Sequence, residues 1–297
     1  MKALLKFILL IICLTFTFIL LSAVFPYSET FNDINDINPK DIVFLSIVSF
    51  WICLVILYIS KKSHSSEKHT AFGLSLSLFF IYGLMTQIDN IFLDNVWVNL
   101  KKADILFQVL GNGISVVLVA ILGMKLFGIG YRPSRYSRKP KRYTALELIL
   151  KLILVGISYV IIYFTFNYFI GWEIEDFRIV YTGNSEMTDF IAHLVDNWNN
   201  KPQVYLFQFI KGALLGLFIL PIVYLFRNRS LQMQTSIFLV FETTALFHII
   251  PNYLIPNGVR MGAFLEVSCL MLLFSIIIWF IFEKIKFSKQ GHYRGDA

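Results

Sequence analysis

Residues 145–171, ALELILKLILVGISYVIIYFTFNYFIG, decide the fold class of this chain, because only Glu147 and Lys151, near the start, interrupt an apolar run with charge. About 20 predominantly apolar residues are enough to cross the hydrocarbon core of a bilayer as an α-helix. Lipid offers no water to bond the backbone, so a helix, which bonds its own amides, is the structure that satisfies it. The stretch therefore predicts a transmembrane helix.

Runs of the same kind fill most of the remaining sequence. The expected spans are residues 3–24, 41–60, 71–93, 105–127, 145–171, 204–226, 235–255 and 259–282. Composition agrees with this interpretation, since 57% of the residues are hydrophobic and 15% are charged, against about 25% charged in soluble domains. We therefore predict an all-α, polytopic transmembrane helix bundle of about eight spans, forming one integral membrane domain over residues 1–297. The first run is longer than the apolar core of a signal peptide, so we expect it to be uncleaved.

Lysine and arginine predict the orientation of these spans. The larger group lies at the termini and in alternate loops: Lys2, Lys6, Lys61, Lys62, Lys68, Arg132, Arg135, Arg138, Lys139, Lys141, Arg142, Arg227, Arg229, Lys284, Lys286, Lys289 and Arg294. The smaller group lies in the other loops: Lys40, Lys101, Lys102, Arg178, Lys201 and Arg260. Positively charged loops stay in the cytoplasm, so both termini are expected there. Helical spans place the protein in the plasma membrane, which is the inner membrane of a bacterium with two membranes.

The net charge of +7 is explained by this topology. The basic cytoplasmic loop at 130–144 is interpreted as an orientation signal, and we expect the lipid bilayer, and no nucleic acid, as partner. A second loop, at 186–198, has apolar residues at helical spacing, and Ser185 or Thr188 is placed to cap a helix there. It predicts a short amphipathic outer helix, which either lids a cavity or lies on the surface without a gating role.

The eight expected spans divide into two sets of four, 1–143 and 144–297. Lys102 and Gln108 open the fourth span with the same spacing with which Arg260 and Glu266 open the eighth. An internal duplication with both halves inserted in the same direction is one explanation. Coincidence in a chain of such biased composition is the alternative.

Polar side chains lie at a similar depth in the outer halves of six expected spans. The candidate solute-binding residues are Gln87, Asp89, Gln108, Asn112, Asn167, Gln208, Lys211, Glu242, His248, Asn252, Arg260 and Glu266. Polar groups at membrane depth are costly and usually mark function, which predicts a polar cavity open to the outside. The alternative is that these groups only join helices, with Lys211 neutralising Glu242 or Glu266. Lys125 and Lys151, near the inner ends, are expected to snorkel.

Motifs for chemistry are missing from the sequence. It contains no His-Glu-x-x-His, no Gly-x-Ser-x-Gly, no phosphate-binding glycine loop and no haem-attachment motif. Its 5 histidines are scattered, so we expect no metal site, no cofactor and no catalytic residues, although enzyme activity stays open.

Three stretches carry a resemblance. They are YFTFNYFIGW at 163–172, KGALL at 211–215 and PNGVR at 256–260, which is followed by Glu266. They resemble a pattern of uncharacterised bacterial multi-pass membrane proteins, which implies an inner-membrane helix bundle and no particular activity.

Three functional hypotheses follow from the sequence. The first is a transporter-like protein that binds a small polar or amphipathic solute in an outward-facing cavity. The second is a membrane sensor, assembly or scaffold protein. The third is an intramembrane enzyme acting on a lipid or lipid-linked substrate, with Glu242, Glu266 or His248 as acid or base.

Overall fold

The computed structural model describes residues 1–29, 31, 39–63, 65–92, 101–127, 143–226, 229–251 and 255–285. The helices in chain order are α1 (Lys2–Val24), α3 (Pro39–Lys62), α4 (Glu67–Leu78), the π-helix η1 (Phe79–Leu84), α5 (Ile88–Phe92), α6 (Lys102–Phe127), α7 (Ala145–Phe166), the π-helix η2 (Asn167–Gly171), α8 (Glu175–Thr182), α9 (Phe190–Asn200), α10 (Pro202–Phe218), α11 (Leu220–Leu225), α12 (Ser230–Leu246), the 3₁₀ helix η3 (Phe247–Ile249) and α13 (Asn257–Glu283). These described segments contain no β-strand, so the all-α expectation is confirmed there.

Six helical segments in the described part of the chain are long and apolar enough to cross a membrane. They are Lys2–Val24, Asp41–Lys62, Lys102–Phe127, Ala145–Gly171, Pro202–Leu225 and Asn257–Glu283. A multi-pass membrane protein is thus supported. The remaining two expected spans, 71–93 and 235–255, are divided into shorter pieces, namely α4, η1 and α5 in the first and α12 and η3 in the second.

Local contacts account for the divisions. In η1, the backbone at Gly83 approaches α6 so closely that an added Cβ would lie 2.9 Å from Gly113 Cα. Just after η1, the Thr86 hydroxyl donates to the carbonyl of Tyr82 at 2.6 Å, and side-chain bonds of this kind bend helices. Pro251, which has no N–H to donate, follows η3 and prevents the helix from continuing.

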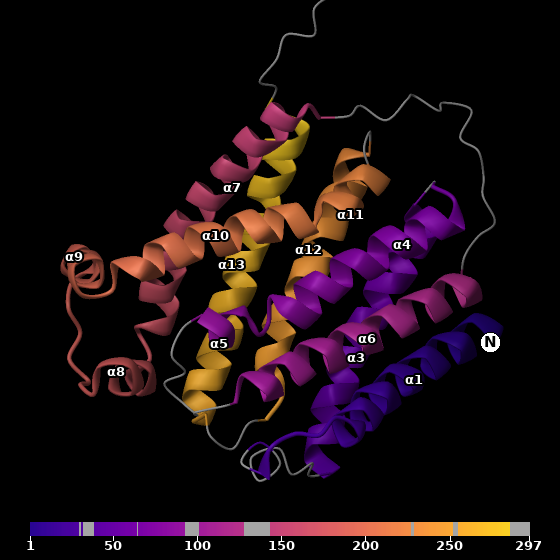
Figure 1. The fold of residues 1–297 in the computed structure, drawn as a ribbon, viewed down its shortest axis with the longest axis horizontal. Helices are drawn as coiled ribbons and strands as arrows, with labels where there is room; N and C mark the ends of the chain where they lie inside the picture. The colour runs from indigo at the N-terminus through magenta and orange to yellow at the C-terminus, as the bar shows by residue number, and fades with distance from the viewer. Residues whose placement is uncertain are drawn as a thin grey trace, which may run out of the picture.

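Figure 1 shows the helices as two groups that pack into one bundle. Helices α1, α3, α4 and α6 lie side by side in the first group, and α7, α10 and α13 pack together in the second. Helix α12 contacts both α13 and α3, and α11 contacts α4. The buried apolar core accordingly runs from Leu10 and Ile52 in the first group to Phe241 and Phe274.

Hydrogen bonds between side chains and backbone reinforce the joint between the groups. The Trp51 indole N–H donates to the Leu239 carbonyl at 3.0 Å. The Ser77 hydroxyl donates to the Phe218 carbonyl at 2.8 Å, where α10 ends before Pro221. The helix is interrupted here, between α10 and α11, and α4 bonds one of the carbonyls at the break.

Glycines bring α7 and α10 into close contact. A Cβ at Gly212 would meet the Tyr159 side chain, and one at Gly156 would lie 2.8 Å from the Phe209 carbonyl oxygen. Small residues of this kind allow helix backbones to approach each other in membranes. The approach places Lys211 of α10 beside Tyr159 of α7.

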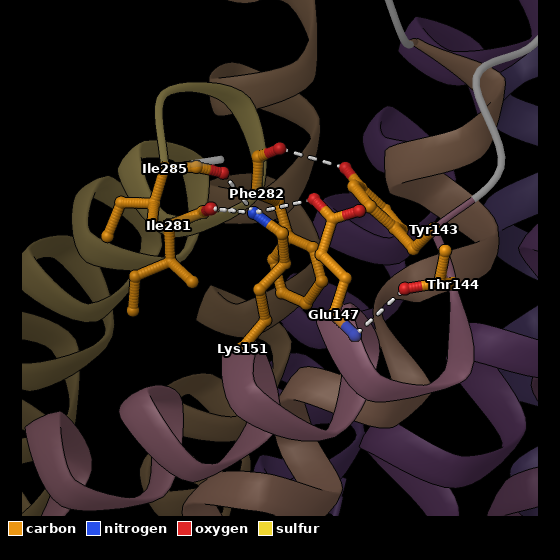
Figure 2. A network of polar contacts seen from close by, with 7 residues as sticks. All are labelled: Tyr143, Thr144, Glu147, Lys151, Ile281, Phe282 and Ile285. Atoms are coloured by element: carbon orange, nitrogen blue, oxygen red, sulfur yellow. Dashed lines mark hydrogen bonds and ion pairs between the residues drawn. The ribbon is translucent and has the colours of Figure 1, made fainter. Parts of the chain in front are cut away.

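Lys151 is fully buried, so the expectation that it snorkels is wrong. Figure 2 shows its ammonium at the C-terminal end of α13, where Nζ donates to the carbonyls of Ile281 and Ile285, both at 2.5 Å. Glu147 lies 3.8 Å away, and the Tyr143 hydroxyl donates to the Phe282 carbonyl at 2.8 Å. A cation near the last carbonyls of a helix stabilises them, which explains why the lysine stays inside. Lys125, by contrast, is exposed.

At the opposite end of α7 lie α8 and α9, at the edge of the molecule in Figure 1, far from the N-terminus. Helix α8 ends at Gly183, whose φ of 72° is the left-handed conformation typical of glycine after a helix. Helix α9 lies in the segment expected to form the outer helix. Its cap is Asp189, whose carboxylate accepts from Ala192 N at 3.1 Å, rather than Ser185 or Thr188.

Candidate functional site

The centre of the site is an ion pair between Lys211 and Asp89. Lys211 Nζ lies 2.6 Å from Asp89 Oδ2, and the lysine and aspartate side chains are 13% and 42% exposed. The lysine comes from α10 and the aspartate from the first turn of α5. Because α5 follows the break at η1, this carboxylate is presented by a short separate helix, on which its side chain stays partly exposed.

Beside the ion pair, Glu266 of α13 is held by Asn167 of η2. The Asn167 amide donates to Glu266 Oε1 at 3.2 Å, and the glutamate is 5% exposed. Gly171 closes the same π-turn, and an added Cβ there would meet Glu266 Oε2. A π-turn widens a helix locally and is frequent at functional sites. Here it places an amide, and a glycine without a side chain, against the carboxyl group.

These two groups form one cluster. The Lys211 ammonium lies within electrostatic range of the Glu266 carboxyl and the Tyr159 hydroxyl. His248 of η3 is in range of both Lys211 and Asp89. We call Asp89, Tyr159, Asn167, Lys211, His248 and Glu266 the polar cluster. Its members come from α5, α7, η2, α10, η3 and α13, and Asp89, Asn167 and His248 lie in or next to the stretches where the α-helical geometry is broken.

Two buried glutamines are close in the sequence to members of the cluster, and the described protein groups do not satisfy them fully. Gln208 lies one turn before Lys211 in α10, and Gln87 lies two residues before Asp89; each is 1% exposed. Among the described residues, neither amide atom of Gln208 has a hydrogen-bond partner, and neither does Gln87 Nε2. Gln87 Oε1 accepts from Asn90 at 2.9 Å. A buried polar group without a partner costs about 1–3 kcal/mol, and a water or another polar molecule bound at these amides would offset that cost.

Some residues expected at the site lie elsewhere. Glu242 Oε1 accepts from the Ser268 hydroxyl at 2.6 Å, which links α12 to α13 apart from the cluster. Arg260 Nη2 donates to Asn257 in the first turn of α13, at 2.9 Å. Gln108 and Asn112 are half-buried on α6, and no hydrogen bond between described residues joins them to the cluster. The remaining candidate, Asn252, lies outside the described residues.

Tyr159 and Gly171 belong to the site although they were not among the candidate residues. The spacing of Tyr159, Tyr163 and Asn167, every four residues, was the signal that placed the tyrosine on the same face as Asn167. Gly171 had no comparable signal, because its role depends on the π-turn. The described residues contain no group of three His, Cys, Asp or Glu that could hold a metal ion.

Comparison with known proteins does not assign this chain to a family. No protein-family model, no curated protein and no solved structure matches the chain. No activity can therefore be transferred to this chain from a relative.

Proposed function

We propose that this chain is a bacterial plasma-membrane protein with eight spans and cytoplasmic termini, which binds a small polar or amphipathic solute at the polar cluster in the manner of a transporter. The observation that carries the proposal is the meeting of Asp89, Lys211 and Glu266, from three helices, one turn from Gln208, whose amide has no partner among the described residues. Ionisable groups inside a membrane bundle mark solute or ion pathways.

Two considerations support eight spans. The lysines and arginines fall into alternate loops only if the divided segments 71–93 and 235–255 also cross the bilayer. Broken helices are tolerated at membrane depth where they are buried in protein or line a polar site, and the breaks at η1 and η3 adjoin the polar cluster. The two divided segments are also the equivalent third spans of the proposed halves 1–143 and 144–297, which supports an internal duplication.

A purely structural role would require that the buried polar groups satisfy one another. Lys211, Glu266 and one carboxylate oxygen of Glu242 each have a protein partner, which favours the alternative of a sensor, assembly or scaffold protein. Gln87 and Gln208 do not fit that alternative. The third hypothesis, an enzyme acting on a lipid-linked substrate, keeps only His248 and Glu266 of its candidate acids and bases in the cluster, because Glu242 lies apart.

The proposal predicts solute-dependent stabilisation of the purified protein in detergent. We would measure thermal unfolding with single amino acids, polyamines, choline, sugars and short-chain fatty acids as probes. A ligand that binds only the folded state raises the melting temperature by mass action. We expect at least one class to do so in the wild type and to lose its effect in Glu266→Gln and Lys211→Met.

Glu242→Gln is the matched control, because it removes a buried carboxylate outside the polar cluster. It should keep the solute effect even if it lowers the melting temperature itself. Equal solute effects in the wild type, Glu266→Gln and Lys211→Met would remove the cluster as the binding site, and a panel without any effect would favour the scaffold alternative.

A further inference from the structure

Helix α9 has an apolar side that the described residues leave largely exposed. Ile191, Val195 and Trp198 are 64%, 53% and 59% exposed. Their spacing of four and three residues places them on one face of the helix. Exposing three large apolar side chains to water is unfavourable in free energy. An apolar environment next to this face would remove that cost.

A second side of α9 packs against the protein. His193 is 6% exposed and its ring centroid lies 4.4 Å from that of Trp172. The Tyr168 hydroxyl donates to the Thr188 carbonyl at 2.7 Å, and the Tyr205 hydroxyl donates to the Leu194 carbonyl at 2.9 Å. These contacts fix α9 across the end of α7 and the start of α10.

The third side is polar and faces water. Asp196, Asn199 and Asn200 are exposed, and the Asn200 amide donates to Asp196 at 2.7 Å. Around the helix, at 3.6 residues per turn, the apolar side lies between the protein-facing side and this polar side. A helix that lies in a membrane surface beside a bundle requires this order of sides.

The exposed apolar side of α9 continues the apolar surface of the spanning segments. Phe190 at the start of α9 contacts Phe169, at 5.3 Å between ring centroids, and Phe169 is 56% exposed. Trp198 contacts Tyr205 at 5.2 Å, and the next residue, Leu206, is 63% exposed. Phe169 and Leu206 lie in two of the segments that are long and apolar enough to cross a membrane. The surface that lipid would cover therefore extends onto α9.

We propose that α9 lies in the lipid interface at this end of the bundle, with Ile191, Val195 and Trp198 among the upper acyl chains and Trp198 as the interfacial anchor. Tryptophan is enriched at this depth because its ring is apolar and its N–H is polar, and amphipathic helices bury one face there. The occupant of the face is the bilayer. The proposal does not depend on a solute at the polar cluster.

One consequence concerns the polar cluster. Lys201 alone separates α9 from α10, which begins at Pro202 and carries Gln208 and Lys211. The bond from Tyr168 to the Thr188 carbonyl attaches the residues just before α9 to η2, which carries Asn167. A helix held in the lipid interface thus fixes the ends of both elements and connects bilayer composition to the geometry of the site.

Tryptophan fluorescence of the full chain in vesicles tests the proposal. A variant that keeps Trp198 and replaces the other four of its 5 tryptophans with Phe is reconstituted into phosphatidylcholine with or without bromine on the acyl chains. We expect blue-shifted emission that bromolipid lowers to about half, since an interfacial helix lies about 5–10 Å into the headgroup and acyl boundary. Emission typical of water without quenching would overturn the proposal. So would blue-shifted emission that bromolipid does not quench, because a second protein copy would then cover the face.

Spin labels provide an independent measurement if the tryptophan variant does not fold. A nitroxide at Val195→Cys should collide more often with oxygen, which is concentrated in lipid, than with a water-soluble nickel chelate. A nitroxide at Asp196→Cys, about 100° further around the helix on the water-facing side, should show the reverse. Equal accessibility profiles at the two positions would contradict the proposal.

Discussion

Separate and combined substitution of Lys211 and Asp89 tests whether the ion pair has the predicted strength. Coulomb's law for the 2.6 Å between Lys211 Nζ and Asp89 Oδ2 gives about 6 kcal/mol at an effective dielectric constant of about 20 and about 1.6 kcal/mol in bulk water. The Asp89 side chain is 42% exposed, and exposed pairs are strongly screened. We therefore expect a coupling free energy near the lower limit, about 2 kcal/mol.

The two single substitutions should differ in cost. Lys211→Met leaves an aspartate that is already partly hydrated, so the free energy of unfolding should fall by about 1 kcal/mol. Asp89→Asn leaves an ammonium that is only 13% exposed, and removal of one partner from a buried pair costs about 3–5 kcal/mol. Because Glu266 remains in electrostatic range of the lysine, we expect the lower limit, about 3 kcal/mol.

Equilibrium unfolding in mixed micelles, analysed as a double-mutant cycle, measures these quantities. The double variant should lose less stability than the two single losses predict together. A coupling below about 0.5 kcal/mol, which is the scatter of additive sites, would show that the pair is not formed in the membrane. A larger loss for Lys211→Met than for Asp89→Asn would refute the burial argument.

Three further predictions concern other parts of the bundle. Lys151→Met should lower the free energy of unfolding by about 2–4 kcal/mol, because two carbonyls at the end of α13 lose a charged donor. Lys125→Met, at an exposed site, should change it by no more than about 0.5 kcal/mol. Equal losses in the two variants would contradict the structural role of Lys151. Burial lowers the pKa of His193. The packing of α9 should therefore be stable above the ordinary histidine pKa of about 6.5 and should weaken as the pH falls below it. Smaller amide-exchange protection factors in α9 would report the weakening, and His193→Gln should remove this pH dependence. Gly212→Ala should separate α7 from α10 and destabilise the protein by about 1–3 kcal/mol. Gly111→Ala, whose added methyl group meets no atom closer than 3.5 Å, should be neutral or stabilising. Similar melting temperatures for the two variants would exclude the close contact between α7 and α10.

The sequence was sufficient for the fold class because hydrophobicity over 20 residues is a strong signal. The segment 145–171 is one continuous helical segment, as expected. The divisions in 71–93 and 235–255 were not foreseen, because apolar periodicity hardly changes when a helix passes through a π-turn or ends in a 3₁₀ turn. Those features arise from contacts such as Gly83 with α6, which no single segment reveals.

Only part of the polar cluster could be predicted from the sequence, and its ion pair could not. Polar residues at a shared depth do converge in the case of Asp89, Asn167, Lys211, His248 and Glu266. The expected partners of Lys211 were glutamates, but Asp89 forms its ion pair, because the break after η1 makes α5 a separate helix that presents this carboxylate. Lys151 was misjudged for a related reason, since its burial depends on where α13 ends.

Water accessibility of Gln208 tests the central claim most directly. In a background without Cys13, Cys53 and Cys269, Gln208→Cys would be exposed to a membrane-impermeant, water-soluble methanethiosulfonate, with Ser275→Cys as the equally buried control in α13; both positions are 1% exposed. If the polar cluster binds solutes from water, the reagent labels Gln208→Cys and leaves Ser275→Cys unmodified. Absence of labelling at Gln208→Cys in a folded protein would show that these polar groups only pack the helices together.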